Sequence, residues 1–319
     1  MKKLFFLLFL YTFAVGAEGQ ESQTLNNFLR LPASSHASAL GGENISIIED
    51  DATLALHNPA LLQSVENRNV TLGYMNYMSG SSVYSAGYAM PTGEKATVGF
   101  YAQYADYGKM KHTDVNGMIL GDFSASDLVI SGVYSHSLST NLVGGVAAKF
   151  IYSDIANYHS ISAAVDLGLN YYNPEKELSA SVAVKNIGGQ LYAYDDEFEK
   201  MPSDLQIGVT KRLVGTPLRL SLTGTDLTHW NYSFFRHLTV GADLLLSNQI
   251  YVAAGYNFRR ANDMSLVTTD TYGEQDKASH GAGLSLGGGI QLERFKLHVS
   301  YGKYHVSSSS VLINIAFAI

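Results

Sequence analysis

The chain has 319 residues, of which only 15% are charged, with a net charge of −7, 30 glycines, 21 tyrosines and no cysteine. Low charge with many aromatics argues against a disordered chain, and the acidic balance argues against a nucleic-acid-binding protein. The lack of cysteine excludes disulfides, thiol catalysis and a cysteine-linked lipid anchor. The mean hydropathy of +0.02 is too low for a bundle of membrane helices. A transmembrane β-barrel, whose polar and apolar faces average out, fits these values.

Residues 1–17 have the pattern of a secretion signal. Lys2 and Lys3 precede an apolar run from Leu4 to Val15, and small residues up to Ala17 form a cleavage site. The run is shorter than the ~20 apolar residues that a spanning helix needs, so a membrane anchor is the weaker alternative. We therefore expect Sec-dependent export and removal of this segment.

Residues 18–68 lack a strand pattern but are rich in apolar residues. Asn58-Pro59 is a turn signal that predicts a short helix over 60–64. We predict that this segment folds into the barrel as a plug, the alternative being a disordered periplasmic tail.

From residue 69 to residue 319 apolar residues recur with a period of two, which indicates β-strands. In the stretch 158–171, one face carries His159, Ile161, Ala163, Val165, Leu167 and Leu169, and the other carries Ser160, Ser162, Ala164, Asp166, Gly168 and Asn170. The strands run for about ten residues, near the ~9–11 of a spanning strand and above the ~5–6 of soluble strands. A soluble β-sandwich also alternates. Strand length, small residues on one face and Phe317 in the last strand favour a barrel.

We predict an all-β fold, an antiparallel transmembrane β-barrel of about fourteen strands over residues 69–319. An even number is typical of single-chain bacterial barrels. The predicted strands begin near Asn69, Ser82, Lys95, Asp127, Asn141, Tyr158, Glu177, Ser203, Pro217, Arg236, Gln249, His280, Phe295 and Ser309.

Connection lengths support this prediction. Every second connection is a short turn, while 106–126, 188–202, 226–235 and 259–279 are long. Barrels have short periplasmic turns and long outer loops, so we expect the long connections to face outward and to bind partners. Our candidate partner-binding residues are Asp106, Lys109, Asp122, Tyr194, Asp196, Phe198, Trp230, Arg259 and Arg260. Of these, Arg259 and Arg260 suit lipopolysaccharide phosphate.

The sequence gives no support for a catalytic or metal site, and we predict no cofactor. No HExxH pattern occurs, and the GxSxG match at 283–287 lies in a strand pattern with no helix after it, unlike a nucleophile elbow. Ser135 and His136 are neighbours, but adjacent strand residues face opposite sides. His298 and His305 lie on or near a predicted strand and are expected to be polar lumen or interface residues. Gly287–Gly289 is followed by no helix, so it indicates a strand bend or a close backbone approach, not a phosphate loop.

Several stretches of the N-terminal segment resemble the PorV/PorQ group of Bacteroidetes outer-membrane proteins. They are residues 28–35, which include Leu31 and Pro32; 39–42, which end in Gly41 and Gly42; Asp50-Asp51; and 58–62, which begin with Asn58 and Pro59. The first two stretches look most like PorQ-type members. The group is itself similar to FadL-type barrels, which have fourteen strands and an N-terminal plug. The resemblance is close in the plug motifs and covers the barrel only in pattern and length.

The resemblance implies an outer-membrane component of the type IX secretion system. Its attachment complex includes a sortase-like protease (PorU), a barrel (PorV) and a surface protein (PorZ), and links cargo to anionic lipopolysaccharide. The expected partners are outer-membrane lipid, lipopolysaccharide and a PorZ-like protein, with PorU- or PorV-like components and no nucleic acid. The resemblance implies no catalytic residues.

Two alternatives remain open. One is a FadL-like transporter of hydrophobic small molecules, with a lateral opening that Gly287–Gly289 would mark by a strand kink. The other is a barrel enzyme acting on lipid, for which the sequence gives little support.

Overall fold

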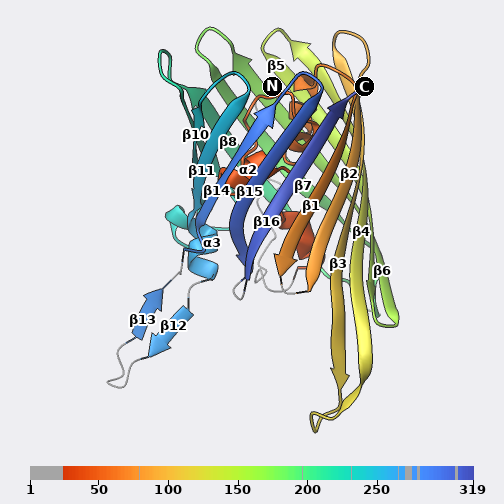
Figure 1. Cartoon of the computed structure of the whole chain (residues 1–319). Coiled ribbons are helices and arrows are strands. Elements are labelled where there is room, and N and C mark those ends of the chain that lie inside the picture. Colours follow the sequence, from red (N-terminus) through yellow and green to blue (C-terminus); the bar gives the residue numbers. More distant parts are fainter. Residues whose placement is uncertain are drawn as a thin grey trace, which may run out of the picture.

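The computed structural model describes residues 24–319 except 79, 196, 231, 265, 270–274, 279–280 and 306–307. The expected signal peptide, residues 1–17, lies outside the described residues. Within them, fourteen antiparallel strands form a closed barrel (Figure 1). The prediction of an all-β, antiparallel fourteen-strand barrel is confirmed.

The barrel strands are β1 (Asn69–Met78), β2 (Ser81–Pro91), β3 (Ala96–Thr113), β4 (Ile119–Ser139), β5 (Leu142–Ile155), β6 (Tyr158–Asn173), β7 (Leu178–Tyr192), β8 (Asp204–Arg212), β9 (Leu218–Gly224), β10 (Leu238–Leu245), β11 (Ile250–Asn257), β14 (Leu284–Gln291), β15 (Phe295–His305) and β16 (Ser308–Ala318). Outside the barrel sheet are η2 (Asn27–Arg30), α2 (Ser35–Ala39), η3 (Ala52–Leu56), η4 (Pro59–Ser64), η5 (Phe234–His237), α3 (Phe258–Asp263) and the hairpin of β12 (Leu266–Thr269) and β13 (Gln275–Ala278). Each barrel strand pairs with its neighbours in sequence, and β1 closes the barrel against β16.

Alternation along the strands sorts side chains between the lumen and the outer surface. On β6, Leu167 is 47% exposed whereas the adjacent Asp166 is 1% exposed. The same strand buries Ser160, Ser162 and Asn170. This is the arrangement of a spanning barrel, in which apolar side chains face lipid and polar ones face the interior. None of the helices in the described residues is long and apolar enough to cross a bilayer.

The two ends of the barrel differ as the connection lengths predict. The C-terminus and the tight turns lie at the upper end in Figure 1, which we call the short-turn end. The β3–β4 hairpin, α3 and the β12–β13 hairpin lie at the opposite end, the long-loop end. Two connections at the long-loop end are themselves tight, because β1 ends at Met78 before β2 begins at Ser81, and β5 ends at Ile155 before β6 begins at Tyr158.

Three predicted long connections were wrong in part. In 188–202, β7 continues to Tyr192. Most of 106–126 is a hairpin, since β3 continues to Thr113 and Lys109 pairs with Ser124 of β4. The register shifts between Asp106 and Lys109. Such a shift interrupts the two-residue period and hides the strand from pattern analysis. Likewise, 259–279 contains most of α3 and the β12–β13 hairpin.

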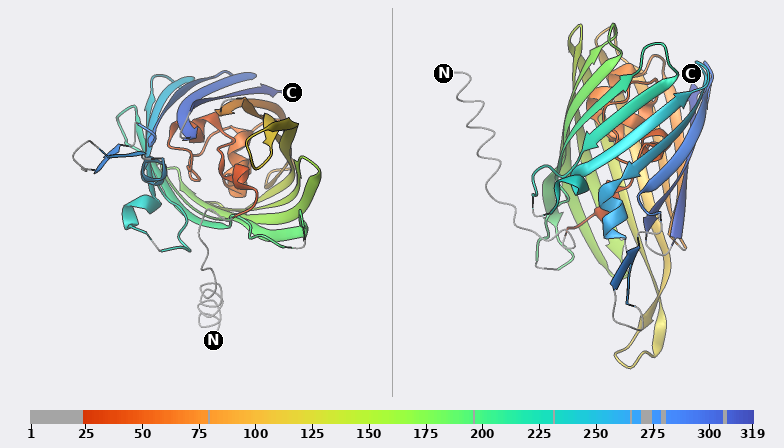
Figure 2. Two further views of the ribbon diagram at one scale, coloured as in Figure 1. Left: turned by 90° about the horizontal axis from the view of Figure 1, so that it is seen from below. Right: turned by 90° about the vertical axis from the view of Figure 1, so that its left-hand side faces the viewer.

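The segment before β1 lies inside the barrel. Seen along the axis, residues from 24 onward fill the ring of strands (Figure 2, left). Its residues Leu54, Leu61 and Leu62 are at most 1% exposed. We call residues 24–68 the lumen segment.

Short helical turns shape the lumen segment, and α2, η3 and η4 each begin with a side-chain cap. Asn58 Oδ1 accepts the Ala60 N–H at 3.0 Å at the start of η4, which confirms the short helix expected after Asn58-Pro59. Asp51 and Ser34 accept backbone N–H groups in the same way at η3 and α2. These bonds satisfy N–H groups that a helix start leaves without partners.

Glycines in the barrel wall allow the backbone of the lumen segment to pack closely against it. A Cβ at Gly145 would lie 2.3 Å from the backbone nitrogen of Ala60, and one at Gly255 would lie 2.2 Å from the carbonyl carbon of Leu40. Only glycine leaves room for so close a backbone approach.

Candidate functional site

Two pockets in the barrel flank the lumen segment. One, of about 760 Å³, lies at the short-turn end, and the other, of about 290 Å³, lies at the long-loop end. They share no lining residue. Residues of the lumen segment line both pockets.

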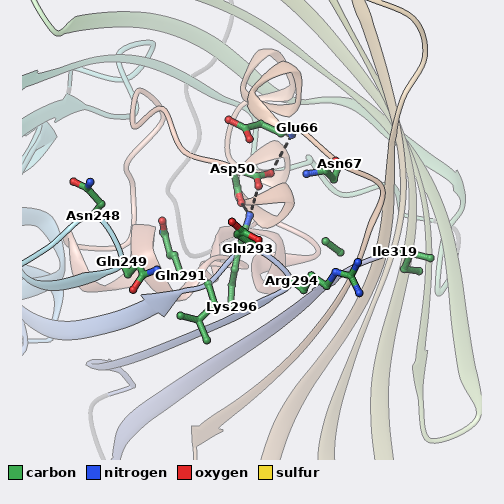
Figure 3. A pocket seen from close by; sticks show the side chains of 12 residues that line it. Asp50, Glu66, Asn67, Asn248, Gln249, Gln291, Glu293, Arg294, Lys296 and Ile319 are labelled. Carbon is green, nitrogen blue, oxygen red and sulfur yellow. Dashed lines mark hydrogen bonds and ion pairs between the residues drawn. The ribbon is translucent and has the colours of Figure 1, made fainter.

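The short-turn-end pocket is polar (Figure 3). Lys296 of β15 forms an ion pair with Asp50 of the lumen segment in its wall. The Asp50 carboxylate also accepts the Glu66 N–H at 3.1 Å. These contacts fix the last part of the lumen segment before it enters β1.

The long-loop-end pocket forms where the lumen segment meets the ends of β1, β11 and β15. Its lining is Asn27, Arg30, Leu31, Gly41, Glu43, Tyr77, Asn257, Arg259, Arg260, Asp263, Met264 and Tyr304. Three guanidinium groups thus line one small pocket, together with two tyrosine rings.

Arg260 is held rigidly in this pocket. Asn257 caps α3 by accepting the Arg260 N–H at 2.9 Å, which sets the direction of the side chain. Its Nε donates to the carbonyl oxygen of Ala282 at 2.7 Å, and its Nη2 donates to Ser285 Oγ at 2.6 Å. The guanidinium carbon stacks 4.5 Å from the centroid of the Tyr304 ring.

One nitrogen of this guanidinium is unused. Nη1 of Arg260 is buried and has no hydrogen-bond partner among the described residues. Arg260 as a whole is only 7% exposed. A buried donor without a partner is costly, and such groups are rare in folded proteins.

The pocket also holds a carboxyl group on the lumen segment. Glu43 accepts a hydrogen bond from Gln206 Nε2 at 3.0 Å. Burial raises the pKa of Glu43 to about 7, although the charge of Lys185 acts in the opposite direction. Near neutral pH this carboxyl is therefore partly protonated, which reduces its neutralisation of the arginines.

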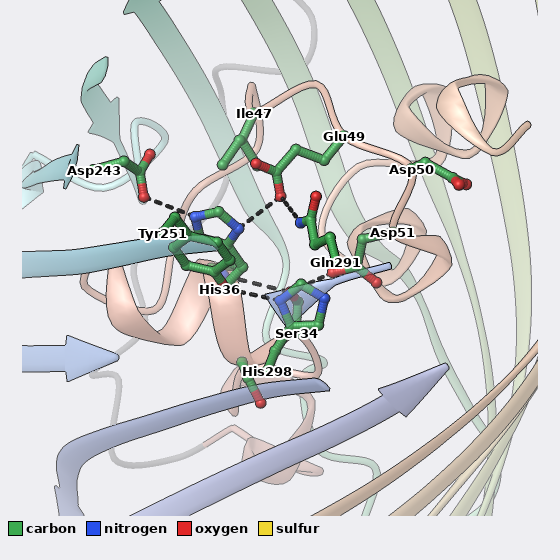
Figure 4. Close-up of polar contacts among 12 residues, drawn as sticks. Ser34, His36, Ile47, Glu49, Asp50, Asp51, Asp243, Tyr251, Gln291 and His298 are labelled. Atoms are coloured by element: carbon green, nitrogen blue, oxygen red, sulfur yellow. Dashed lines mark hydrogen bonds and ion pairs between the residues drawn. The ribbon is translucent and has the colours of Figure 1, made fainter. Parts of the chain in front are cut away.

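A second polar cluster ties the lumen segment to the wall (Figure 4). His36 contacts Glu49 through Nδ1 and Asp243 through Nε2, both at 2.7 Å. Arg219 bridges the same two carboxylates, at 2.6 Å from Glu49 and 2.8 Å from Asp243. Tyr251 stacks on the His36 ring at 3.8 Å.

The charges in this cluster are matched. Burial alone would lower the pKa of His36, but Glu49 and Asp243 outweigh it and raise the pKa to about 9. The pKa of Glu49 lies well below its ordinary value, because His36 and Arg219 outweigh its burial. At neutral pH two cations therefore face two carboxylates.

Sequence reasoning did not predict either polar cluster. One signal was present, since Arg219 and Asp243 occupy positions that alternate with apolar residues on their strands. A charged residue facing the lumen needs a partner there, which points to charged residues of the lumen segment such as Glu49.

Three solved structures resemble the chain over almost its whole length. A Pseudomonas aeruginosa FadL homologue matches with a TM-score of 0.56 and 11% identity, covering 93% of this chain and 99% of that one. The Pseudomonas putida toluene transporter TodX matches with a TM-score of 0.56 and 12% identity, over 90% and 97%. The CymD monoaromatic hydrocarbon channel matches with 0.59 and 12%, over 91% and 98%.

The fold is that of the FadL-type outer-membrane barrels. No protein-family model and no curated protein matches the sequence. At 11–12% identity the likeness concerns the fold.

The barrel brings some of the candidate partner-binding residues together and separates others. Lys109 and Asp122 line one outer groove of about 800 Å³ beside the β3–β4 hairpin. Phe198 and Trp230 are exposed, at 67% and 57%. Asp106 is half-buried and caps a turn at Gly108. Tyr194 is half-buried too, and Asp196 lies outside the described residues.

The paired arginines differ in environment. Arg259 forms ion pairs with Asp226 at 3.4 Å and with Asp263 at 3.6 Å. Arg260 instead bonds the backbone of Ala282 and Gly283. Both arginines line the long-loop-end pocket.

The glycine run in β14 lies in continuous strand pairing. The pairing of Gly287–Gly289 with β11 and β15 shows no register shift. A Cβ at Gly287 would lie 2.7 Å from Ala39 Cβ, and one at Gly289 would lie 2.7 Å from His298 Nδ1. This crowding agrees with the predicted close approach, and His298 is buried in the lumen, hydrogen-bonded to Tyr251 at 2.7 Å.

In the part of the chain that the structure describes, no three His, Asp or Glu residues are placed to hold a metal ion.

Proposed function

We propose that this chain is an outer-membrane channel for small hydrophobic molecules. The observation that carries the proposal is the match, over at least 89% of the chain, to structures named as monoaromatic hydrocarbon channels and a toluene transporter. The match extends over nearly the full length of those proteins.

The interior supports a route along the barrel axis. A pocket lies near each end of the barrel, and residues of the lumen segment line both pockets. We expect transport to require a shift of this segment. Its attachment includes neutral polar contacts, such as Ser46 Oγ with Thr210 Oγ1 at 2.8 Å, and such groups can exchange their partners for water.

Uptake measurements test this function. We would express the full chain in a Gram-negative host that lacks its own long-chain fatty-acid channel and follow uptake of labelled toluene and oleate. Uptake above that of the empty host would support the proposal. A correctly inserted barrel without uptake of either compound would overturn it.

A second function, anchoring a surface protein of a type IX attachment complex, is favoured by one specific feature. Beyond Asp106 the β3–β4 hairpin projects past the barrel rim (Figure 1). Its tip exposes apolar side chains, with Val115 fully exposed, Met118 at 66% and Leu120 at 59%. Exposed apolar clusters of this kind are typical of protein-binding sites.

Shortening the hairpin would test the anchoring function separately. In a host with a type IX system, deletion of 109–124 should leave the barrel inserted and release cargo unattached into the medium. Normal cleavage and attachment of cargo after this deletion would count against an anchoring role.

A further inference from the structure

We propose that the loop after β9 and the start of α3 form an aromatic surface that inserts into membrane lipid at the long-loop end, where the barrel wall is too short to cover the bilayer. The residues concerned are Trp230, Phe234, Phe235 and Phe258, which we call the rim aromatics. The proposal goes beyond the channel function, because it concerns the outside of the barrel and holds whatever passes through the lumen.

The barrel wall is short where the rim aromatics lie. β9 has seven residues, and β10 and β11 have eight each. A seven-residue strand tilted by about 45° rises only about 16 Å, whereas the apolar band of a spanning barrel is about 25 Å tall. On this side the strands alone therefore leave part of the lipid-facing height uncovered.

The missing height is at the long-loop end. β7 pairs with β6 as far as Tyr192, but its pairing with β8 stops at Lys185. β9 ends at Gly224, which pairs with Leu238 at the start of β10. Beyond that point residues 225–237, which include η5, take the place of paired strands.

The rim aromatics of this loop are exposed on the outside of the barrel. Seen along the axis, the turn of η5 lies outside the ring of strands (Figure 2, left, teal). Trp230 is 57% exposed, Phe234 58% and Phe235 63%. Contiguous exposed apolar surface of this kind marks a binding or membrane-contact site.

The rim aromatics form a row that begins on the lipid-facing wall. On β11 every second residue from Tyr251 to Asn257 is buried, so Tyr256 lies on the outer face. The distances between successive ring centroids are 5.0 Å for Tyr256–Phe258, 6.3 Å for Phe258–Phe235, 6.0 Å for Phe235–Phe234 and 6.5 Å for Phe234–Trp230. The row therefore continues a surface that already faces lipid, which favours lipid over a soluble partner as its occupant.

The charged groups beside the row fit the boundary between acyl chains and headgroups. The guanidinium carbons of Arg236 and Arg259 lie 4.6 Å and 5.7 Å from the centroid of the Tyr232 ring. Both arginines also pair with Asp263. Aromatic girdles lie at the membrane interfaces of barrels, and arginine side chains there keep their charged ends in the polar layer. We therefore place the rim aromatics at this boundary and not in the centre of the bilayer.

Trp230 is the only tryptophan in the sequence, so its fluorescence reports on the row in the natural chain. The full chain would be reconstituted into phosphatidylcholine vesicles with and without phosphatidylcholine brominated in its acyl chains, and acrylamide would serve as the quencher dissolved in water. We expect the brominated lipid to reduce Trp230 emission at least twofold. Quenching by acrylamide alone would overturn the proposal. Protection from both quenchers would overturn it too, because a second protein chain would then cover the row.

Two relocated tryptophans calibrate this measurement. Trp230→Phe with Leu220→Trp places the fluorophore on the outer face of β9, where Leu220 is 46% exposed, and the brominated lipid should quench it. Trp230→Phe with Val115→Trp places it at the tip of the β3–β4 hairpin, where Val115 is fully exposed, and acrylamide should quench it. We expect acrylamide to quench Trp230 at least fivefold less than the hairpin-tip tryptophan. Equal quenching of these two would contradict insertion.

Phe234→Ser with Phe235→Ser tests whether the row inserts as a unit. Both side chains are exposed, so the barrel should still fold, and its heat-dependent mobility in gel electrophoresis would verify this. We expect quenching of Trp230 by the brominated lipid to fall at least twofold, because the loop loses two of its apolar contacts with lipid. The matched control is Val115→Ser with Met118→Ser, which removes exposed apolar surface at the hairpin tip and should leave Trp230 unchanged. Unchanged lipid quenching in the folded first variant would refute a role of the row in insertion.

Discussion

Asp243 on the barrel wall accepts a hydrogen bond from His36 of the lumen segment at 2.7 Å, and both side chains are almost completely buried. Arg219 and Glu49 complete a cluster with two positive and two negative groups. Removing one partner of such a buried cluster leaves a charge unbalanced. This lowers the free energy of unfolding far more than removing one partner of an exposed ion pair.

Asp243→Asn should therefore lower the free energy of unfolding by about 3 kcal/mol, in the range observed when one partner of a buried ion pair is removed. Urea titration of the protein in detergent micelles would measure this change. The control is Arg212→Gln, because its ion pair with Glu177 is 3.6 Å long and solvent-exposed. That change should cost less than about 1 kcal/mol.

Stability should fall on the alkaline side. The pKa of His36 is raised from 6.5 to about 9, so the folded protein holds this proton more tightly than the unfolded chain. The stabilisation is complete below pH 6.5 and is lost as the pH rises through 9. The unfolding temperature of the natural chain should decrease over this window, and that of His36→Gln should not. A parallel decrease in both proteins would show that another group titrates.

Locking the lumen segment to the wall should stop uptake. Ser46 Oγ and Thr210 Oγ1 are 2.8 Å apart, so Ser46→Cys with Thr210→Cys places two sulfurs within reach of a disulfide. The chain has no other cysteine, so no other bridge competes. We expect oxidation to abolish uptake of toluene and a reductant to restore it. Uptake by the oxidised variant would mean that the segment need not move there.

A matched pair of glycine substitutions tests the packing of the lumen segment. Gly145→Ala would place Cβ 2.3 Å from backbone atoms of Pro59 and Ala60, whereas Gly132→Ala meets nothing within 4 Å. The first should cost about 1–3 kcal/mol through overpacking. Limited proteolysis should cleave the lumen segment faster in Gly145→Ala and at the natural rate in Gly132→Ala. Equal rates would contradict close packing of the segment against the wall at Gly145.

The barrel was predictable from the sequence because a single physical rule, alternation between lipid and lumen, repeats along it. The rule located β6 at Tyr158 and β15 at Phe295. It did not locate the start of β4, because beyond Asp106 the hairpin leaves the barrel wall. Neither face of the hairpin contacts lipid there, so apolar and polar residues need not alternate.

The candidate site was less predictable, because it depends on contacts between distant residues. The pair Arg259 and Arg260 does not by itself predict that Asn257 caps a short helix from which Arg260 points inward. The motif residues also have local roles: Gly41 and Gly42 have positive φ angles at the end of α2, and Asn58 caps η4. These residues specify the path of the lumen segment. Motifs of this kind therefore predict the conformation of the segment better than they predict a binding partner.

The joining of β1 to β16 has a consequence for how the molecule is assembled. The lumen segment passes from the Thr24–Lys200 bridge to Asn69 at the start of β1, inside a wall that is complete only when the first and last strands pair. Backbone atoms of the segment touch the wall closely at Gly145 and Gly255, which leaves no clearance for threading through a finished cylinder. The sheet must therefore curl around a segment already in place, and the β1–β16 seam is expected to be the last contact formed. Contacts between the two ends of a chain are the slowest to form, which gives the segment time to settle before enclosure.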